Sequence, residues 1–285
     1  MAVSLELERK IENLKTVHEI VNSMKALATL TVRKVEGLLP TIRMYNDHVH
    51  QSMGEILSRF PYLAEAPAPA GGRTTYVVFT SEQGLCGTFN ERLLDYCRGL
   101  EDAAEALFII SGKKGYDEAL ARGLPVLKAL KGPVSADGIE IEVINLTVEL
   151  YELYRSGAFD RLSVIFAFHR RLGEYRIISS RVLPPDLGKF SRRKALLREP
   201  LMYMRPETVL ERLVEEHLLI SLYRAYAESL ASENSSRLRS MDSAVLNIER
   251  KMEELTTLYN YVRQEEVTAE VIEIISGYES LREGE

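Results

Sequence analysis

The stretch LERKIENLKTVHEIVNSMKALATLTVRKVEGLLPTIRMYNDHV, residues 7–49, decides the fold. Its apolar positions recur at alternating intervals of four and three residues, the heptad spacing that brings two helices together along a narrow seam. Pro40 lies inside the pattern, which continues on both sides, so we expect one helix from about Leu5 to Phe60, kinked at the proline. The seam consists of Leu7, Ile11, Leu14, His18, Val21, Met24, Ala28, Thr31, Val35, Leu38, Ile42, Tyr45 and Val49.

The last quarter of the chain carries the same pattern. Between Glu207 and Leu281 it contains one glycine, Gly277, and no proline. At roughly 1.5 Å per residue, the two helices would be about 80 and 110 Å long, too long for the interior of a compact domain. The middle of the second helix, AYAESLASENSSRL (225–238), is rich in small residues that would let another helix approach closely. The second seam consists of Leu238, Met241, Val245, Ile248, Met252, Leu255, Tyr259 and Val262.

Between the two helices the sequence pattern changes. Apolar runs alternate with helical patterns, which favours a mostly parallel sheet covered by helices, and the last two runs favour an antiparallel hairpin. We therefore predict the α/β class, with a long antiparallel coiled coil of N- and C-terminal helices flanking a Rossmann-like α/β domain. The expected parts are an N-terminal coiled-coil helix (1–64), a linker (65–72), the α/β domain (73–190), a basic linker (191–206) and a C-terminal coiled-coil helix (207–285).

Composition narrows the function classes. The 285 residues are 46% hydrophobic and 27% charged with a net charge of −6, which is ordinary for a folded protein and argues against a general nucleic-acid binder. No window approaches the ~18 consecutive apolar residues of a membrane span, and the N-terminus resembles neither a signal nor a transit peptide. Cys86 and Cys97, the two cysteines, indicate a reducing compartment. We expect a protein of the cytosol or of the cytosolic face of a membrane.

The stretch TTYVVFTSEQGLCGTFNERLL, residues 74–94, has the outline of a phosphate-binding loop: a β-branched run, a glycine turn and a helical pattern. A Walker loop needs a lysine and a Ser/Thr after its last glycine, and a dinucleotide fingerprint needs a third glycine. The turn from Gly84 to Thr88 has neither the lysine nor the third glycine, and Glu82 would set a negative charge beside the phosphate. We interpret the stretch as a tight strand-to-helix turn and predict no direct nucleotide binding.

Other candidate sites are weaker. His48 and His50 lie two residues apart and would point to different sides of a helix. His18 on the seam fits a packed core histidine better than a metal ligand. Cys86 and Cys97 lack a partner spacing for zinc. The sequence therefore predicts no catalytic residue, no metal site and no cofactor.

Four stretches, in order along the chain, resemble the γ subunit of F-type ATP synthases. KIENLKTVHEIVNSMKALATLTVRK (10–34) is similar to the family's N-terminal helix. Residues 80–87 are similar to its Thr-Ser-x-x-Gly-Leu-Cys-Gly motif, and Met241-Asp242-x-Ala244 to a third motif. The most specific match is residues 259–270, which carry Tyr-Asn-x-x-Arg-Gln-x-x-Val-Thr-x-Glu.

Three departures point to a divergent γ lineage. Thr88 stands where the family usually has a second glycine, and Val21-Asn22-Ser23 replaces its usual Thr-Lys-Ala. Arg205-Pro206 replaces the usual Glu-Pro ahead of the C-terminal helix, at the family's contact with the membrane ring.

The resemblance implies a non-catalytic rotor shaft that couples ion transport, which is proton transport or sodium transport, to ATP synthesis or hydrolysis. In this family the coiled coil ends inside a hexamer of α and β subunits. The other end, with the α/β domain, rests on the membrane c-ring and binds the ε subunit. Ion flow turns ring and shaft, and the asymmetric shaft drives each β subunit through conformations of different nucleotide affinity. For this chain it implies a peripheral protein on the cytoplasmic face of a prokaryotic cell membrane.

The resemblance and the seam together single out a small set of residues. Arg263, Gln264, Thr268 and Met24 are expected to contact β subunits, Val21, Ala28, Leu238, Met241 and Val245 to form the rotor seam, and Tyr203 and Arg205 to lie on the c-ring and ε side.

Antiparallel pairing sets the register. It places Met24 opposite residues 236–245 and the N-terminus near residue 260, so the last ~30 Å of the C-terminal helix overhangs. Two rival classes stay open. A free-standing α/β enzyme with helical decorations would bind a nucleotide by itself. A coiled-coil scaffold related to chromosome-organising ATPases would need a Walker loop and a mid-chain coil.

Overall fold

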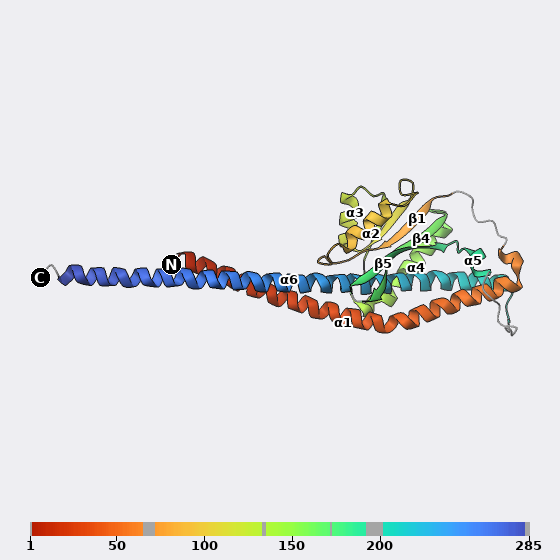
Figure 1. Cartoon of the computed structure of the whole chain (residues 1–285). Coiled ribbons are helices and arrows are strands. Elements are labelled where there is room, and N and C mark those ends of the chain that lie inside the picture. Colours follow the sequence, from red (N-terminus) through yellow and green to blue (C-terminus); the bar gives the residue numbers. More distant parts are fainter. Residues whose placement is uncertain (1, 65–71, 133–134, 172, 192–201, 283–285) are drawn as a thin grey trace. The chain divides into compact units, whose positions relative to one another are not determined.

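The computed structural model describes residues 2–64, 72–132, 135–171, 173–191 and 202–282 (Figure 1). Most of the two predicted linkers, residues 65–71 and 192–201, lies outside the described residues.

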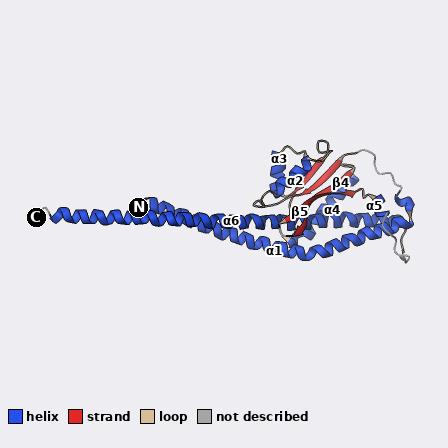
Figure 2. Cartoon of the chain, viewed as in Figure 1, coloured by secondary structure: helices blue, strands red, loops and turns tan. Residues whose placement is uncertain are grey.

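Helices occupy both ends of the chain, as Figure 2 shows. Helix α1 spans Ala2–Arg59 and continues through Pro40, while α6 spans Pro206–Arg282. The chain forms two compact units: one consists of the helix segments up to residue 27 and from residue 239, the other of residues 28–238.

The first unit is an antiparallel helix pair. Lys25 Nζ lies 2.6 Å from Asp242 Oδ1, and His18 Nε2 lies 3.3 Å from Glu249 Oε1. Residue numbers fall along α1 as they rise along α6, which confirms the predicted direction. Asp242 also lies within the stretch predicted to face Met24.

The seam and the overhang of this unit can be followed residue by residue. Val21 and Met241 are 9% and 3% exposed, and Val245 is half-buried. Ser4 hydrogen-bonds Glu266, so the start of α1 pairs beyond the predicted position near residue 260. The overhang of α6 is therefore shorter than predicted by one to two turns.

The second unit contains a five-stranded sheet of order β3-β2-β1-β4-β5. The first four strands are parallel, and β5 runs antiparallel to β4. This topology, with helices on both faces, confirms the predicted fold class. The strands are β1 (Thr74–Phe79), β2 (Leu107–Ser111), β3 (Val126–Leu130), β4 (Arg161–Arg171) and β5 (Glu174–Leu183).

Two hydrophobic cores hold the sheet. On one face α2 (Phe89–Arg98) and α3 (Lys113–Ala121) pack against β1, β2 and β4. On the other face α4 (Ile139–Arg155) packs together with α1 and α6. Shorter elements are the 3₁₀ turns Pro61–Ala64 and Ala136–Gly138 and the helix α5 (Leu187–Ser191).

In the second unit the buried face of α1 differs from the predicted seam. Leu38 and Tyr45 are 41% and 45% exposed, whereas their neighbours Leu39 and Asn46 are 3% and 2% exposed. The physical reason is the number of partners: here α1 shares a core with α4 and the sheet as well as α6, so its buried stripe is not a two-helix seam.

Candidate functional site

Strand β4 extends several residues beyond the end of its neighbour β1. Their pairing reaches Ile165 opposite Val78, but β4 continues to Arg171. In the part of the chain that the structure describes, no strand continues on that side beyond Phe79. Buried peptide groups there need other partners. In sheets of this order, the edge beyond β1 and β4 is also where the strand order reverses and ligands bind.

Serines of α6 fill this place. Ser229 Oγ accepts a hydrogen bond from the Ala167 amide at 3.1 Å and donates one to the Phe79 carbonyl at 3.1 Å. Ser232 Oγ donates to the Ala167 carbonyl at 2.9 Å. Because the side chains in this stretch of α6 are small, the ends of β1 and β4 can approach the helix closely. The small-residue stretch therefore packs against the sheet edge as well as against α1. Helix α6 thus occupies the crevice that such a sheet offers to a ligand.

An ion pair between a buried carboxylate and a partly exposed guanidinium continues the same contact. Glu228 is fully buried, and its carboxylate accepts hydrogen bonds from Arg43 Nε at 2.8 Å, Arg43 Nη2 at 2.9 Å and the His169 amide at 2.9 Å. Arg43 Nη2 also donates to the His169 carbonyl at 3.0 Å. The pair therefore joins α1, α6 and β4.

The imidazole of His169 adds a second link to α1. His169 Nε2 lies 2.7 Å from Glu36 Oε1, and His169 is 3% exposed. The Arg43 guanidinium carbon lies 4.8 Å from the Phe168 ring centroid, a cation–π distance. We call Glu36, Arg43, His169 and Glu228 the Glu228 cluster.

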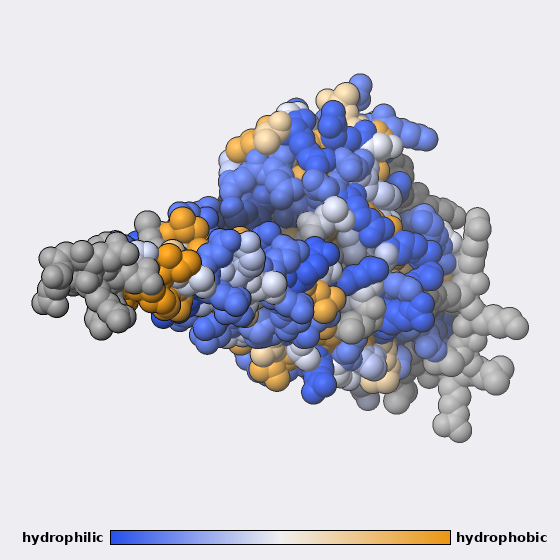
Figure 3. Space-filling view, turned by 60° about the vertical axis from the view of Figure 1, so that its left-hand side comes forward, coloured by the Kyte–Doolittle hydropathy of each residue, from blue (hydrophilic) through white to orange (hydrophobic). Residues whose placement is uncertain are grey.

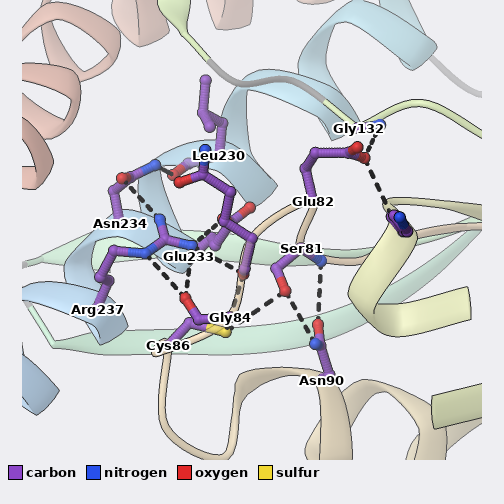
Figure 4. Close-up of polar contacts among 12 residues, drawn as sticks. Ser81, Glu82, Gly84, Cys86, Asn90, Gly132, Leu230, Glu233, Asn234 and Arg237 are labelled. Carbon is purple, nitrogen blue, oxygen red and sulfur yellow. Dashed lines mark hydrogen bonds and ion pairs between the residues drawn. The ribbon is translucent and has the colours of Figure 1, made fainter. Parts of the chain in front are cut away.

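The glycine turn of residues 81–87 docks on α6 through Arg237 (Figure 4). Arg237 Nη2 donates to Glu233 Oε1 at 2.6 Å, to the Gln83 carbonyl at 3.0 Å and to the Gly84 carbonyl at 3.3 Å. Burial raises the pKa of the Glu233 carboxyl to about 7, although Arg237 opposes the shift. The turn is thus held by a cation reaching two backbone carbonyls.

Glu82 of the turn takes up an amide at the start of the next helix, α3. Glu82 Oε2 accepts hydrogen bonds from the Lys113 amide at 3.0 Å and the Gly132 amide at 2.8 Å. Lys113 begins α3, so a carboxylate of the chain already takes an amide at a helix start that could hold phosphate. Gly112 must be glycine, because its φ is 111° and a Cβ would lie 2.6 Å from the Ser81 carbonyl oxygen.

Other candidates from the sequence have structural partners. His50 Nε2 lies 3.1 Å from His217 Nδ1, while His48 is exposed, so the two histidines do point to different sides. Cys86 and Cys97 are buried, and burial raises the pKa of Cys97 to about 12. Among the described residues, no group of three or more His, Cys, Asp or Glu could hold a metal ion.

The predicted contact residues lie elsewhere than this site. Arg263, Gln264 and Thr268 are exposed on α6 in the first unit, and Met24 is half-buried on α1. The seam residues Ala28 and Leu238, which belong to the second unit, are 1% and 8% exposed.

Sequence reasoning missed the Glu228 cluster and Arg237. The sequence does contain a pattern that could have pointed to them. Glu228, Glu233 and Arg237 lie inside a run of Ala and Ser on a long helix, where small neighbours indicate close packing. Their partners on β4 and in the turn are far away in sequence, so no spacing rule connects them.

None of the helices in the described part of the chain is both long and apolar enough to cross a membrane. The arrangement of the site offers attachment rather than chemistry: it fastens an α/β domain to α6 through hydrogen bonds and buried charges.

Comparisons with known proteins agree along the whole chain. A family model described as ATP synthase matches residues 4–281. ATP synthase gamma chains of Bdellovibrio bacteriovorus and of Nitratiruptor sp. are 26% and 27% identical, each covering 99% of this chain and 100% of the relative. A chain from the Euglena gracilis mitochondrial ATP synthase (OSCP, F1 and c-ring) has a TM-score of 0.71 at 19% identity, covering 99% of this chain and 96% of that one. A chain from the Tetrahymena thermophila central stalk and c-ring structure has a TM-score of 0.61 at 20% identity, covering 79% and 99%.

Proposed function

The chain belongs to the ATP synthase gamma-chain family, and we propose that it couples ion-driven rotation of a membrane c-ring to the conformational cycle of catalytic β subunits. As a gamma chain it is a non-catalytic subunit, the central shaft of a rotary ATP synthase. Nucleotide chemistry belongs to the β subunits, in line with a glycine turn that has no lysine and that carries Glu82, whose carboxylate binds the amides of Lys113 and Gly132.

The observation that carries the proposal is the exposed apolar end of α6. Past Glu266 the helix carries large apolar side chains that are 47–71% exposed, and apolar residues gather beside the C-terminal end in Figure 3. Exposed apolar surface of this kind marks a protein–protein contact. A surrounding hexamer of α and β subunits would enclose it. The side chains are Val267, Val271, Ile272, Ile274 and Ile275.

Three polar residues on the same helix are proposed to contact a β subunit. Arg263, Gln264 and Thr268 are exposed, and Thr268 Oγ1 is hydrogen-bonded only within its own helix among the contacts described, to the Gln264 carbonyl at 2.7 Å. The Arg263 guanidinium can offer a forked donor to a carboxylate of the partner. Met24 on α1 is proposed to lie in the same contact region.

The start of α6 is proposed to face the c-ring and the ε subunit. Tyr203 and Met204 are 95% and 57% exposed and line an open hollow with Ile56 and Leu213. Arg205 is exposed beside them. An exposed tyrosine and methionine at one place suit a protein contact better than a solvated surface.

We propose a peripheral location on the cytoplasmic face of the cell membrane, where the chain is attached through its partners. The family membership supports this, because the curated relatives come from bacteria. We likewise propose that the chain is organised in five parts: an N-terminal helix, a linker, the α/β domain, a basic linker and a C-terminal helix.

Rotation of the assembled complex tests the function. The chain is assembled with its α and β subunits, the hexamer is fixed to a surface, and a bead is attached through a cysteine replacing the exposed Lys114. Labelling is selective because Cys86 and Cys97 are buried. ATP should turn the bead continuously in one direction. A complex that hydrolyses ATP while the bead stays at one angle would contradict the shaft function.

The rival enzyme class is tested on the isolated chain. Calorimetric titration with ATP and ADP should show no binding, because the turn lacks a phosphate-binding lysine and the Glu82 carboxylate takes the amide at the start of α3. Micromolar affinity for either nucleotide would favour the free-standing enzyme instead.

A further inference from the structure

We propose that Glu228 is a positioning residue that locks α1, α6 and β4 into one rigid body, so that torque carried by α6 turns the α/β domain without slip. The proposal rests on the shaft function and adds a residue that the function requires. It follows from three features of the Glu228 cluster: its connectivity, its position on α1 and its chemistry.

The connectivity is concentrated on one carboxylate. Glu228 stands on α6, and it accepts two hydrogen bonds from Arg43 of α1 and one from the amide of His169 on β4. Arg43 closes the ring by donating to the His169 carbonyl. Both peptide groups of His169 are therefore held by one ion pair, and β4 cannot slide along α6 without breaking charge-assisted bonds.

The cluster contacts α1 on both sides of Pro40, where the helix lacks a backbone hydrogen bond. Pro40 has no N–H, so the carbonyl of Glu36 lacks its intrahelical partner. Glu36 and Arg43 flank the proline, and both side chains contact β4 or α6. A helix under torsion would bend first where a hydrogen bond is missing. The cluster holds it on both sides of that point.

The chemistry favours rigidity over stability. A buried ion pair contributes little net free energy of folding, because desolvation offsets the attraction, and apolar residues of similar volume serve as well. Apolar contacts are non-directional and allow small rotations. A bidentate guanidinium–carboxylate pair fixes both distance and orientation. Glu228 has a side-chain exposure of 0% and Arg43 one of 37%, so water reaches the guanidinium but not the carboxylate that holds it.

The test separates rigidity from stability. Arg43→Met with Glu228→Gln removes both charges of the pair. Arg224, whose Nε lies 3.9 Å from Glu228 Oε1, keeps a side chain that is 28% exposed, so the double variant should still restore most of the thermal midpoint lost in either single variant. Arg43→Lys keeps the charge but removes the fork. The matched control is Arg212→Met with Glu215→Gln, which removes an exposed pair on the same helix, 2.8 Å between Arg212 Nη1 and Glu215 Oε2.

Stiffness is read from bead fluctuations in the α, β and γ complex paused without ATP. One bead is attached to the domain at Lys114→Cys, and another to α6 at the exposed Glu211→Cys. In the double variant and in Arg43→Lys, the angular variance of the domain bead should rise about twofold or more, because the first loses the three hydrogen bonds of Arg43 and the second loses the forked geometry. The α6 bead and the control pair should not change.

The bead measurements distinguish loss of the lock from general loosening and from failure of the shaft function. Unchanged variance of the domain bead in Arg43→Lys, or in a double variant with a restored midpoint, overturns the lock. Equal broadening of both beads also overturns it, since that is general loosening. An unmodified complex whose bead does not turn under ATP refutes the shaft function itself and not the lock.

Discussion

Through its hydroxyl, Ser229 is the hydrogen-bond partner of one backbone group on each of two strands, β4 and β1. It is 5% exposed and binds the Ala167 amide and the Phe79 carbonyl. Ser229→Ala leaves both groups buried and unpaired, which should lower the free energy of unfolding by about 1–3 kcal/mol. The measurement is urea unfolding of the isolated chain. Ser243→Ala is the control, because its hydroxyl binds its own helix at an exposed position and its loss should be near neutral.

Glu233 gives a pH dependence with a definite sign. Burial raises its pKa from 4.5 to about 7, so the folded chain holds a proton that the unfolded chain releases between these values. Stability from this group is present at low pH and is lost as the pH rises from 4.5 towards 7. Glu233→Gln should therefore flatten the decline of stability over that window. If variant and parent curves stay parallel there, Arg237 holds Glu233 ionised throughout.

Sequence reasoning reached part of the site at this scale. The interpretation of the stretch as a tight strand-to-helix turn agrees with the turn between β1 and α2, and the structure uses the Glu82 carboxylate to bind the amides of Lys113 and Gly132. Its attachment to α6 through Arg237 was out of reach. A side chain and two backbone carbonyls that are 154 and 153 residues away in the sequence meet there, and hydrophobic periodicity says nothing about such polar contacts.

The long helices show where periodicity succeeds and fails. The heptad pattern predicts the antiparallel pair of the first unit, where each helix has one partner. In the second unit the buried stripe of α1 includes Leu39 and Asn46 in place of Leu38 and Tyr45. A heptad seam describes a two-helix contact, whereas a helix packed on several elements buries a wider arc.

Two neighbouring leucines distinguish the faces. Leu39→Ala should lower the free energy of unfolding by about 2–5 kcal/mol, because Leu39 is 3% exposed and its loss leaves a cavity. Leu38→Ala should cost well under half of that, since Leu38 is 41% exposed. Chemical unfolding of the two variants gives the comparison. The opposite order would mean that the strict heptad seam extends through this part of α1.

At the scale of the whole molecule, the α/β domain is a ligand-binding topology put to another use. The crevice beyond β1 and β4 is occupied by Ser229 and Ser232, and an amide at the start of α3 is taken by Glu82. A sheet that would bind a nucleotide instead binds a helix of its own chain. This suits a subunit that transmits rotation and leaves ATP chemistry to its partners.

The other end of that transmission is proposed to be the contact of α6 with β subunits. Arg263 and Gln264 are exposed, and neither lies on the seam. Replacing both by alanine should leave the isolated chain folded, with an unchanged thermal midpoint. In the assembled complex, ATP turnover should fall several-fold or more, because hydrogen bonds with a charged partner contribute about 1–3 kcal/mol each.

A matched pair on the same helix makes this result interpretable. Arg250 Nη2 donates to Asn247 Oδ1 at 3.1 Å, and both residues are exposed in the same unit. Alanine at both positions removes an arginine and an amide, as the first variant does, but outside the proposed contact, so turnover should stay near that of the parent. Equal loss in both variants would reflect a general effect of charge on assembly. Full turnover with Arg263 and Gln264 replaced would show that these side chains are ordinary surface, and the β contact would then have to come from the apolar residues beyond them.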